Sequence, residues 1–440
     1  MSPKPKIGLI FSAVPSETKT WPYVGYDYES RAKKLYDIIS KELSEIDFIG
    51  EIVYHREDIE NVLNKLGNVD GYVIYYLGIW LGITENVIKR GKPTILIDDL
   101  YAGSGEFLIE YGKLRRKGYK NVIAIASSNI RDVLKTIRLL WVLYKLKNSR
   151  IVVVTDRKKL WGMSQEELKE KIRKDYGLEL IFYNSEIINK LYENVDDSEA
   201  DRWKRKWMNE ASRIVEVREE DIFKAAKLYI VLRDILKKEN ADAITVDCLT
   251  LVYGAKIPAY PCLGFFQLNN DGLTGTCEAD IDSTVTMLLA RYLTDRPSFV
   301  SDPVIDLASN QIIYAHCVAA SKVYGTDTIS MPYEIWTHAE DRSGASIRVL
   351  FPLGEKVTTV KINMDKRAMS IHSGVSVANV EEEKACRTKL AVQANAYRIL
   401  ENWNLKHDFS WHRVTVIGDY RREFINIAKL LGLDVVEEDT

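Results

Sequence analysis

Acidic residues and histidines that could bind a metal gather in the last third of this 440-residue chain. Five of its six histidines lie there: His316, His338, His372, His407 and His412. Neutral imidazole and carboxylate together suit manganese, iron, cobalt or zinc. The pattern predicts a divalent metal site, and a chance clustering of so few histidines is the alternative.

Glu278 lies in the segment that is most informative for chemistry, residues 269–304. Apolar side chains recur there at helical spacing, at Ile281, Val285, Leu288, Leu289 and Tyr292. This spacing predicts a helix that starts near Thr276 or Cys277, with Glu278 in its first turn. A carboxylate at that position either caps free backbone N–H groups or faces a cleft as a ligand, and position alone favours the cap.

Asp302 and His316 lie on two short strand-like runs that follow this helix. Asp302 interrupts the run SFVSDP, and His316 lies fourteen residues later in the run IIYAHC. If the two strands pair through a turn around Ser309 and Asn310, both side chains reach the same end of a sheet. A turn-capping aspartate and an ordinary core histidine are the alternative reading.

The composition narrows the class of partner. The 61 basic and 63 acidic residues nearly balance, and no block of like charge is long enough to bind nucleic acid or a membrane. The amino-terminal apolar run is short and lacks a cleavage pattern. No apolar run approaches the ~20 residues that cross a bilayer. We expect a cytoplasmic protein with small-molecule partners.

The cysteines are odd in number and all lie in the second half of the chain, at Cys248, Cys262, Cys277, Cys317 and Cys386. They include no Cys-x-x-Cys pair. This pattern argues against a disulfide framework and against a structural zinc site. We expect small buried side chains in a reducing compartment.

The elements that must position these residues fall into three predicted domains, because 440 residues exceed one hydrophobic core. In residues 1–146, short β-branched runs alternate with helical patterns, which predicts a Rossmann-like, doubly wound parallel sheet. The runs are residues 7–11, 52–54, 72–76, 94–97 and 122–126. Neither nucleotide-binding glycine pattern occurs around the run AGSGEF at 102–107, so no nucleotide cofactor is expected.

The same alternation restarts after the LKNS segment and predicts a second Rossmann-like domain over 147–297, which ends in the Glu278 helix. From Pro297 onward, strands joined by tight turns replace the helices. Residues 298–440 are therefore predicted to form a β-rich, antiparallel, barrel-like domain. It should close with a helix from about Arg421 to Leu431.

Two segments of the chain resemble the L-fucose isomerase and L-arabinose isomerase superfamily, in its fucose isomerase-like branch. The run GTCEAD, followed by a helix that ends in LTDRP, is similar to the segment with the family's first metal-binding glutamate, which falls on Glu278. The strand SFVSDP places the second acidic ligand on Asp302, where arabinose isomerases have Glu. The run from Ser410 to Val436 looks like the family's final histidine, strand, turn and helix, which gives His412 the last ligand role.

The resemblance implies an intramolecular oxidoreductase that interconverts an aldose and a ketose through a metal-chelated enediol. The metal would be Mn²⁺, or Co²⁺, Fe²⁺ or Zn²⁺, and Glu278 and Asp302 would also be catalytic. His316 matches a histidine ligand of arabinose isomerases and is a further candidate ligand. Members of the family are oligomers, so a trimer or hexamer is expected. The resemblance names L-fucose or an arabinose as the sugar without choosing between them.

Sugar binding also needs polar partners and an aromatic face. The candidates, each as plausible in ordinary packing, are Glu17, Trp21, Trp80, Gln267, Asn269, Trp336 and His407. Two other functions suit the same scaffold: a non-catalytic sugar-binding or sensing protein, and a metal-dependent sugar lyase or hydrolase.

Overall fold

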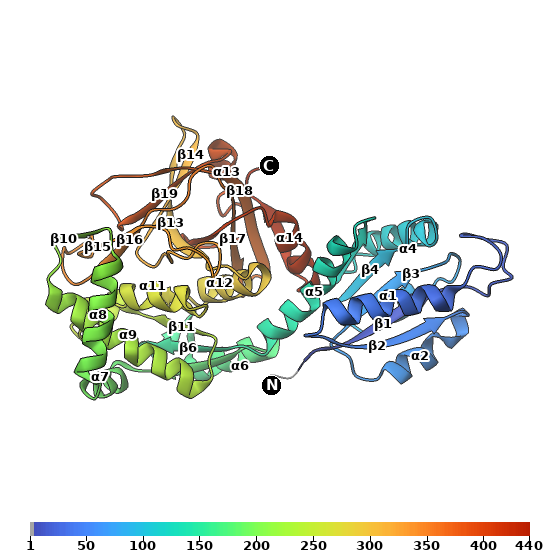
Figure 1. Cartoon of the computed structure of the whole chain (residues 1–440), viewed down its shortest axis with the longest axis horizontal. Helices are drawn as coiled ribbons and strands as arrows, with labels where there is room; N and C mark the ends of the chain where they lie inside the picture. The colour runs from blue at the N-terminus through green and yellow to red at the C-terminus, as the bar shows by residue number, and fades with distance from the viewer. Residues whose placement is uncertain (1–3) are drawn as a thin grey trace. The chain divides into compact units, whose positions relative to one another are not determined.

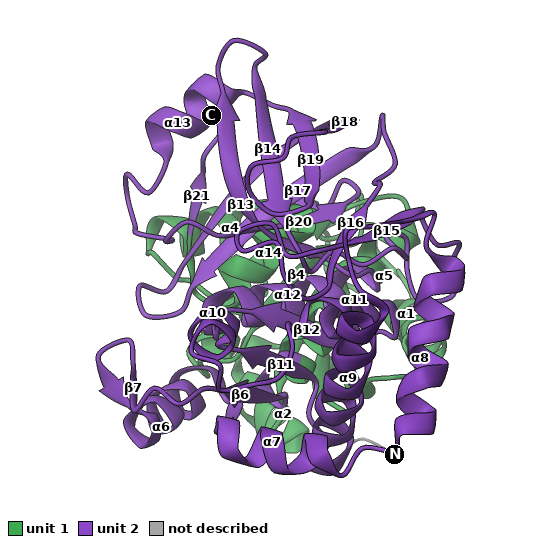
Figure 2. Ribbon diagram, turned by 90° about the vertical axis from the view of Figure 1, so that its left-hand side faces the viewer, with its two compact units in different colours: residues 1–145, 422–434 green, residues 146–421, 435–440 purple. Residues whose placement is uncertain are grey.

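The computed structural model describes residues 4–440. The chain forms two compact units, residues 1–145 with 422–434 and residues 146–421 with 435–440 (Figure 2). No helix among the described residues is both long and apolar enough to span a membrane.

The first unit is built on a five-stranded parallel sheet with the order β2-β1-β3-β4-β5 (Figure 1). Its strands are β1 (Lys6–Ser12), β2 (Asp47–Val53), β3 (Gly71–Tyr76), β4 (Thr94–Asp98) and β5 (Val122–Ala126). Its helices are α1 (Tyr28–Glu42), α2 (Ile59–Leu66), α3 (Thr84–Ile88), α4 (Ser104–Arg116), α5 (Ile130–Lys147) and most of α14 (Arg421–Leu430), with the short helix η1 (Arg56–Asp58) before α2. The predicted strand at 52–54 covered only the end of β2, because this edge strand carries mostly partly exposed side chains and lacks the apolar signal of a central strand.

The second unit contains another parallel sheet, of four strands in the order β12-β11-β6-β9. These strands are β6 (Arg150–Val154), β9 (Glu179–Tyr183), β11 (Ala243–Val246) and β12 (Thr274–Cys277). The helices are α6 (Gln165–Tyr176), α7 (Ser185–Glu193), α8 (Asp197–Glu210), α9 (Glu219–Glu239), α10 (Cys248–Tyr253), α11 (Cys262–Asn270) and α12 (Ile281–Thr294). A small hairpin, β7 (Lys159–Leu160) with β8 (Met163–Ser164), precedes α6.

An antiparallel barrel completes the second unit. Its strand order is β17-β20-β13-β14-β19-β18, and pairing of β17 with β18 closes it. The strands are β13 (Phe299–Asp306), β14 (Gln311–His316), β17 (Lys356–Asn363), β18 (Ala368–Asn379), β19 (Thr388–Gln393) and β20 (Arg413–Ile417), with β21 (Asp434–Glu437) added beside β18. A short helix α13 (Ala396–Asn402) and a separate sheet of β10 (Arg213–Val215), β15 (Tyr333–Trp336) and β16 (Ser346–Val349) lie outside the barrel sheet.

The predicted fold class is confirmed: two parallel-sheet α/β parts are followed by a closed antiparallel barrel. Helix α12 is buried on nearly every side, because it packs against β11 and β12 of the parallel sheet and against β17 and β20 of the barrel. The last residue of β12 and the first turn of α12 therefore lie where the parallel sheet meets the barrel. The first compact unit ends at Lys145 and also includes residues 422–434, and the predicted domain break near residue 146 stays a prediction. A separate third domain from residue 298 stays a prediction.

Candidate metal site

Glu278 lies in the turn between β12 and α12, not in the first turn of the helix as the sequence predicted. The helix begins at Ile281, and its cap is Asp280, whose carboxylate accepts a hydrogen bond of 2.9 Å from the backbone N–H of Ser283. The predicted start was about four residues too early, because Asp280 supplies the cap that position alone had assigned to Glu278.

The backbone of this turn is left-handed at two consecutive residues that are not glycine. The φ angles are 67° at Glu278 and 52° at Ala279. A left-handed conformation costs a residue with a side chain roughly 1–2 kcal/mol. Such outliers concentrate at functional sites. Here the turn directs a carboxylate away from the helix that follows it.

The barrel strands bring Asp302, His316 and His412 to the same place. The predicted pairing of β13 with β14 is confirmed, with Asp302 opposite Ala315 and therefore next to His316. On its other side β13 pairs with β20, where Ser301 lies opposite Arg413. This register places His412, one residue before β20, beside Asp302.

Four of the predicted site residues converge. His412 Nε2 lies 3.2 Å from Asp302 Oδ1 and 3.6 Å from Glu278 Oε2, and His316 Nε2 lies 3.8 Å from Glu278 Oε1. Donor atoms of Glu278, His316 and His412 all lie within 4.8 Å of one another. About a third of the Glu278 side chain (32%) is exposed, while both histidines are buried, so solvent reaches the group on the Glu278 side.

The donor atoms of this group fit a divalent cation. Asp302 Oδ1 is buried and has no hydrogen-bond partner within residues 4–440, although His412 Nε2 lies 3.2 Å from it. An unpartnered buried carboxylate oxygen costs free energy unless a cation or donor approaches it. Two carboxylates and an imidazole are a donor set of catalytic metal sites, which keep positions open for substrate.

His412 is oriented by two charged residues that the sequence had not singled out for this role. Its Nδ1 lies 2.8 Å from Asp280 Oδ2, and the same carboxylate oxygen pairs with the buried Lys361 at 2.7 Å. A proton on Nδ1 leaves the Nε2 lone pair facing Glu278 and Asp302, as in the carboxylate–histidine pairs behind many metal ligands. Asp280 could have been found from its place in the GTCEAD run. Lys361 could have been found as a lysine within the otherwise β-branched run of β17.

The pKa values of the two carboxylates are shifted in opposite directions. Burial, together with the nearby charge of Asp302, raises the pKa of Glu278. Burial alone would also raise the pKa of Asp302, but the imidazoles of His412 and His316 hold it below its usual value. Burial would lower the pKa of His412, yet its contacts with Asp280 and Asp302 raise it to about 10. Environments that shift the pKa values of two neighbouring carboxyl groups in opposite directions are typical of acid–base sites.

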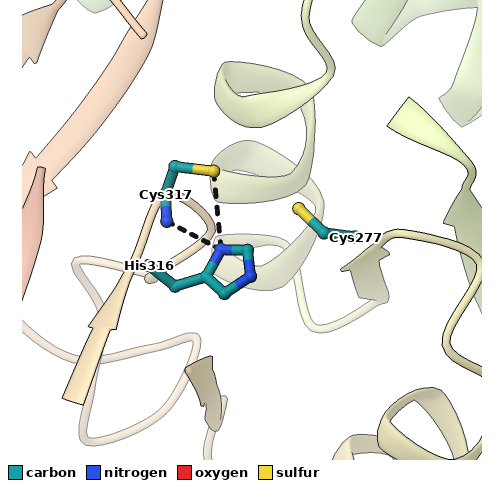
Figure 3. Close-up of side chains that lie close together, drawn as sticks. All are labelled: Cys277, His316 and Cys317. Atoms are coloured by element: carbon teal, nitrogen blue, oxygen red, sulfur yellow. Dashed lines mark hydrogen bonds between the residues drawn. The ribbon is translucent and has the colours of Figure 1, made fainter. Parts of the chain in front are cut away.

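His316 turns its two nitrogens toward different groups. Nδ1 accepts a hydrogen bond of 2.9 Å from the backbone N–H of Cys317, whereas Nε2 points toward Glu278 and has no hydrogen-bond partner within the described chain (Figure 3). Burial lowers the pKa of this imidazole to about 4. The neutral ring therefore carries its proton on Nε2.

The remaining predicted residues lie elsewhere in the described chain. Gln267 and Asn269 are buried in α11 and bonded internally: Gln267 accepts from the Trp207 indole, and Asn269 bonds the backbone of Gly275. Trp336 donates to Glu334. His407 packs edge-on against Phe409. Glu17, Trp21 and Trp80 belong to the first compact unit, and both tryptophans are exposed.

Known proteins offer a partial likeness. No protein-family model matches the chain. A sulfoquinovose isomerase from a Clostridium species is 25% identical over 218 residues, which cover 47% of this chain and 46% of that protein. Sulfoquinovose isomerases from Priestia aryabhattai and Priestia megaterium are each 24% identical over 229 residues, 49% of this chain and 48% of theirs. The chain spans about half the length of the curated relatives it matches.

A solved structure described as a XylFII molecule aligns with 66% of this chain and 94% of its own, at 14% identity and a TM-score of 0.16. A score this low supports no inference about fold or function.

Proposed function

We propose that this protein is a divalent-metal-dependent aldose–ketose isomerase. The observation that carries the proposal is the convergence of Glu278, Asp302 and His412 around a buried carboxylate oxygen that has no hydrogen-bond partner in the described chain. Three relatives named as isomerases of a sugar support the reaction class.

In this proposal Glu278, Asp302 and His412 hold the metal. A metal held there would supply Lewis-acid stabilisation of the negative charge that develops on the sugar oxygens. Asp302 stays ionised because its pKa is lowered. Asp280 fixes Nδ1 of His412, so that Nε2 faces the site and would bind the metal once its proton is displaced. His316 presents an N–H group from Nε2.

Glu278 is the residue suited to move the proton. Its carboxylate is partly exposed, so it can reach a bound sugar as a general base. It removes the hydrogen from C2 of the aldose and returns it to C1, while a proton passes from O2 to O1. Asp302 then serves to hold charge close to the reacting atoms.

The sugar is a separate part of the proposal. The names of the relatives make sulfoquinovose, an aldose with a sulfonate group, the first candidate. L-fucose and the arabinoses follow from the family resemblance. We also propose, on that resemblance, a trimer or hexamer in the cytoplasm.

Turnover measured on a panel of aldoses tests the proposal. Sulfoquinovose, L-fucose, D-arabinose and L-arabinose are each incubated with metal-free protein, Mn²⁺-loaded protein and the loaded Glu278→Gln variant, and the ketose is quantified. We expect ketose only with the metal-loaded unsubstituted protein. Release of smaller fragments would indicate a lyase or hydrolase instead.

A binding measurement separates failure of the reaction from failure of the site. If no aldose is converted while a sugar still raises the unfolding temperature, the isomerase proposal is wrong and a sugar-binding protein takes its place. If Mn²⁺ does not bind at all, the metal site itself is wrong.

A further inference from the structure

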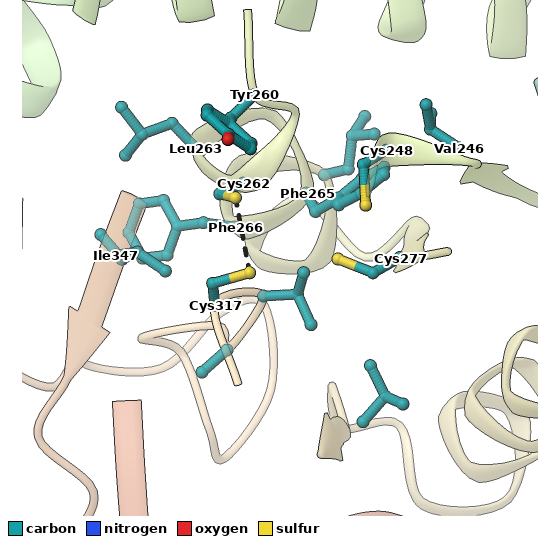
Figure 4. Packing of buried hydrophobic residues seen from close by; sticks show 14 of the residues in the cluster. Val246, Cys248, Tyr260, Cys262, Leu263, Phe265, Phe266, Cys277, Cys317 and Ile347 are labelled. Atoms are coloured by element: carbon teal, nitrogen blue, oxygen red, sulfur yellow. Dashed lines mark hydrogen bonds between the residues drawn. The ribbon is translucent and has the colours of Figure 1, made fainter. Parts of the chain in front are cut away.

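All five cysteines of the chain meet in one buried cluster. They come from separate parts of the second unit: the starts of α10 and α11, the end of β12, the residue after β14, and the loop before β19. Cys317 interacts with Cys262, Cys277 and Cys386, and Cys277 interacts with Cys248. Figure 4 shows four of these thiols turned toward one another. The spacing of cysteines along the sequence gave no sign of this arrangement.

We propose that Cys277, Cys317 and His316 Nδ1 bind a thiophilic divalent cation such as Zn²⁺, separate from the metal at Glu278. Donor atoms of these three residues all lie within 4.8 Å of one another, and all three residues are buried (Figure 3). The proposal does not depend on the isomerase activity.

The distances suit a tetrahedral site. Cys317 Sγ lies 3.5 Å from His316 Nδ1 and 3.4 Å from Cys262 Sγ. Zinc bonds of about 2.3 Å to sulfur and about 2.0–2.1 Å to nitrogen place tetrahedral donors roughly 3.5–3.8 Å apart. The spacing of Cys317 Sγ and His316 Nδ1 is therefore close to that of two ligands in a tetrahedral site.

The orientation of His316 favours this group over the carboxylates. Its Nδ1 carries the lone pair on the cysteine side, where it now accepts the Cys317 backbone N–H. Its Nε2–H points toward Glu278 Oε1 at 3.8 Å. Metal-binding histidines commonly direct the second ring N–H toward a carboxylate. His316 thus has the arrangement of a ligand for the thiol site, with Glu278 as the acceptor behind it.

Charge balance also favours a divalent cation. The surroundings of the thiols are apolar, and include Val246, Phe265 and Phe266 (Figure 4). Binding replaces the protons of Cys277 and Cys317: one M²⁺ enters, two thiolate bonds form and two protons leave. The resulting group is neutral overall, which a buried apolar environment tolerates far better than an isolated charge.

Cobalt binding tests the site directly, because thiolate ligands give Co²⁺ an intense sulfur-to-metal charge-transfer band that oxygen and nitrogen ligands do not. The reduced, metal-free full chain is titrated with Co²⁺, alongside Glu278→Gln, Cys317→Ser and Cys248→Ser. Cys248→Ser is the matched control, since Cys248 is buried in the same cluster but lies outside the proposed donors. We expect the band at one equivalent in the unsubstituted protein, in Glu278→Gln and in Cys248→Ser, and its loss in Cys317→Ser.

Absence of the band in the unsubstituted protein would overturn the proposal, as would its persistence in a folded Cys317→Ser. If that variant does not fold, X-ray absorption of the zinc-loaded unsubstituted protein decides. At least two sulfur neighbours at about 2.3 Å support the site, and a shell of only nitrogen and oxygen at about 2.0–2.2 Å overturns it. In that case the cysteines are small core side chains.

Discussion

Two proposed metal sites meet at the imidazole of His316, and the side chains that form them differ in donor type, charge and exposure. The first group consists of hard or borderline donors, from Glu278, Asp302 and His412. The pKa values of its two carboxylates are shifted, and the group is open to solvent on the Glu278 side. Cys277 and Cys317 are buried soft donors, and the contact with the Cys262 thiol, together with burial, raises the pKa of Cys317 to about 12. Donor softness selects different cations, so neighbouring sites can stay chemically distinct.

The two groups are incomplete in different ways: one contains a charged oxygen without a hydrogen-bond partner, and the other contains neutral thiols. The carboxylate group lacks a partner for a charged oxygen, which calls for a cation. The thiols lack a charge, and remain protonated until a metal replaces the protons. Strain separates the groups as well: within the described chain, Glu278 and Ala279 have left-handed φ angles, whereas Cys277, His316 and Cys317 do not.

Removing the Glu278 carboxylate should produce the largest effect and should affect one group only. We expect Glu278→Gln to lower kcat by about 10²–10⁴-fold, the range that general acid–base groups contribute. The cobalt–thiolate band should persist, because the amide oxygen of the introduced glutamine can still accept from the His316 Nε2–H group. Steady-state kinetics and cobalt absorption on the same preparation provide the two readouts, and a joint loss would show that the two groups form a single site.

A third buried group in the barrel tests whether missing partners, rather than burial, mark a metal site. Glu438 is fully buried and fully partnered, 2.7 Å from Arg413 Nη2 and 2.8 Å from His372 Nδ1. We expect Glu438→Gln to lower the free energy of unfolding by about 3–5 kcal/mol, since Arg413 is left buried without its partner. Metal content should stay unchanged. Glu437→Gln, which removes an exposed partner of Arg421, is the control.

The loss of stability in Glu438→Gln should depend on pH. Burial alone would raise the pKa of Glu438, but the Arg413 charge lowers it. A folded-state pKa below the unfolded value of about 4.3 stabilises the protein fully above that pH. This stabilisation disappears as the pH falls through the lowered value. Urea unfolding at pH 7 and pH 3 should show the difference between Glu438→Gln and the unsubstituted protein shrinking in acid, and a constant difference would contradict the assignment.

Asp280 should affect the carboxylate group by way of His412. We expect Asp280→Asn to weaken Mn²⁺ binding by about 10–100-fold, as loss of a carboxylate behind a histidine ligand does elsewhere. Asp282→Asn is the matched control, because Asp282 lies on the same turn of α12 but accepts from the Met364 backbone instead. Calorimetric titration with Mn²⁺ measures both, and equal weakening would mean that helix packing, not His412 orientation, is responsible.

The smallest expected effect concerns the strained turn. Ala279→Gly relieves a left-handed residue, worth about 1–2 kcal/mol, but adds glycine entropy of about 0.5–1 kcal/mol to the unfolded chain. The free energy of unfolding should therefore change by no more than about 1 kcal/mol. Chemical denaturation measures it, and a large loss would show that the Ala279 methyl group has a packing role.

The sequence predicted the fold class because strand periodicity and the change of pattern after Pro297 are local signals. It also predicted the pairing that joins Asp302 to the neighbourhood of His316, since one short turn connects the strands. It could not predict the contact of Lys361 with Asp280, because residues 81 positions apart meet only through the barrel. The cysteine cluster could not be predicted for the same reason. The start of α12 was misplaced because Glu278 and Asp280, two residues apart, could each have been the cap.

The return of residues 422–434 to the first compact unit affects the order in which that unit can be completed. The backbone N–H of Asn121 donates to the carbonyl of Lys429 in α14, just before β5 begins. During translation, the first 145 residues are made long before this helix. The first unit can therefore be completed only after the second parallel sheet and the barrel strands have been synthesised. A gene fragment that ends at residue 145 would encode every strand of the sheet yet leave one helix of the finished unit unmade.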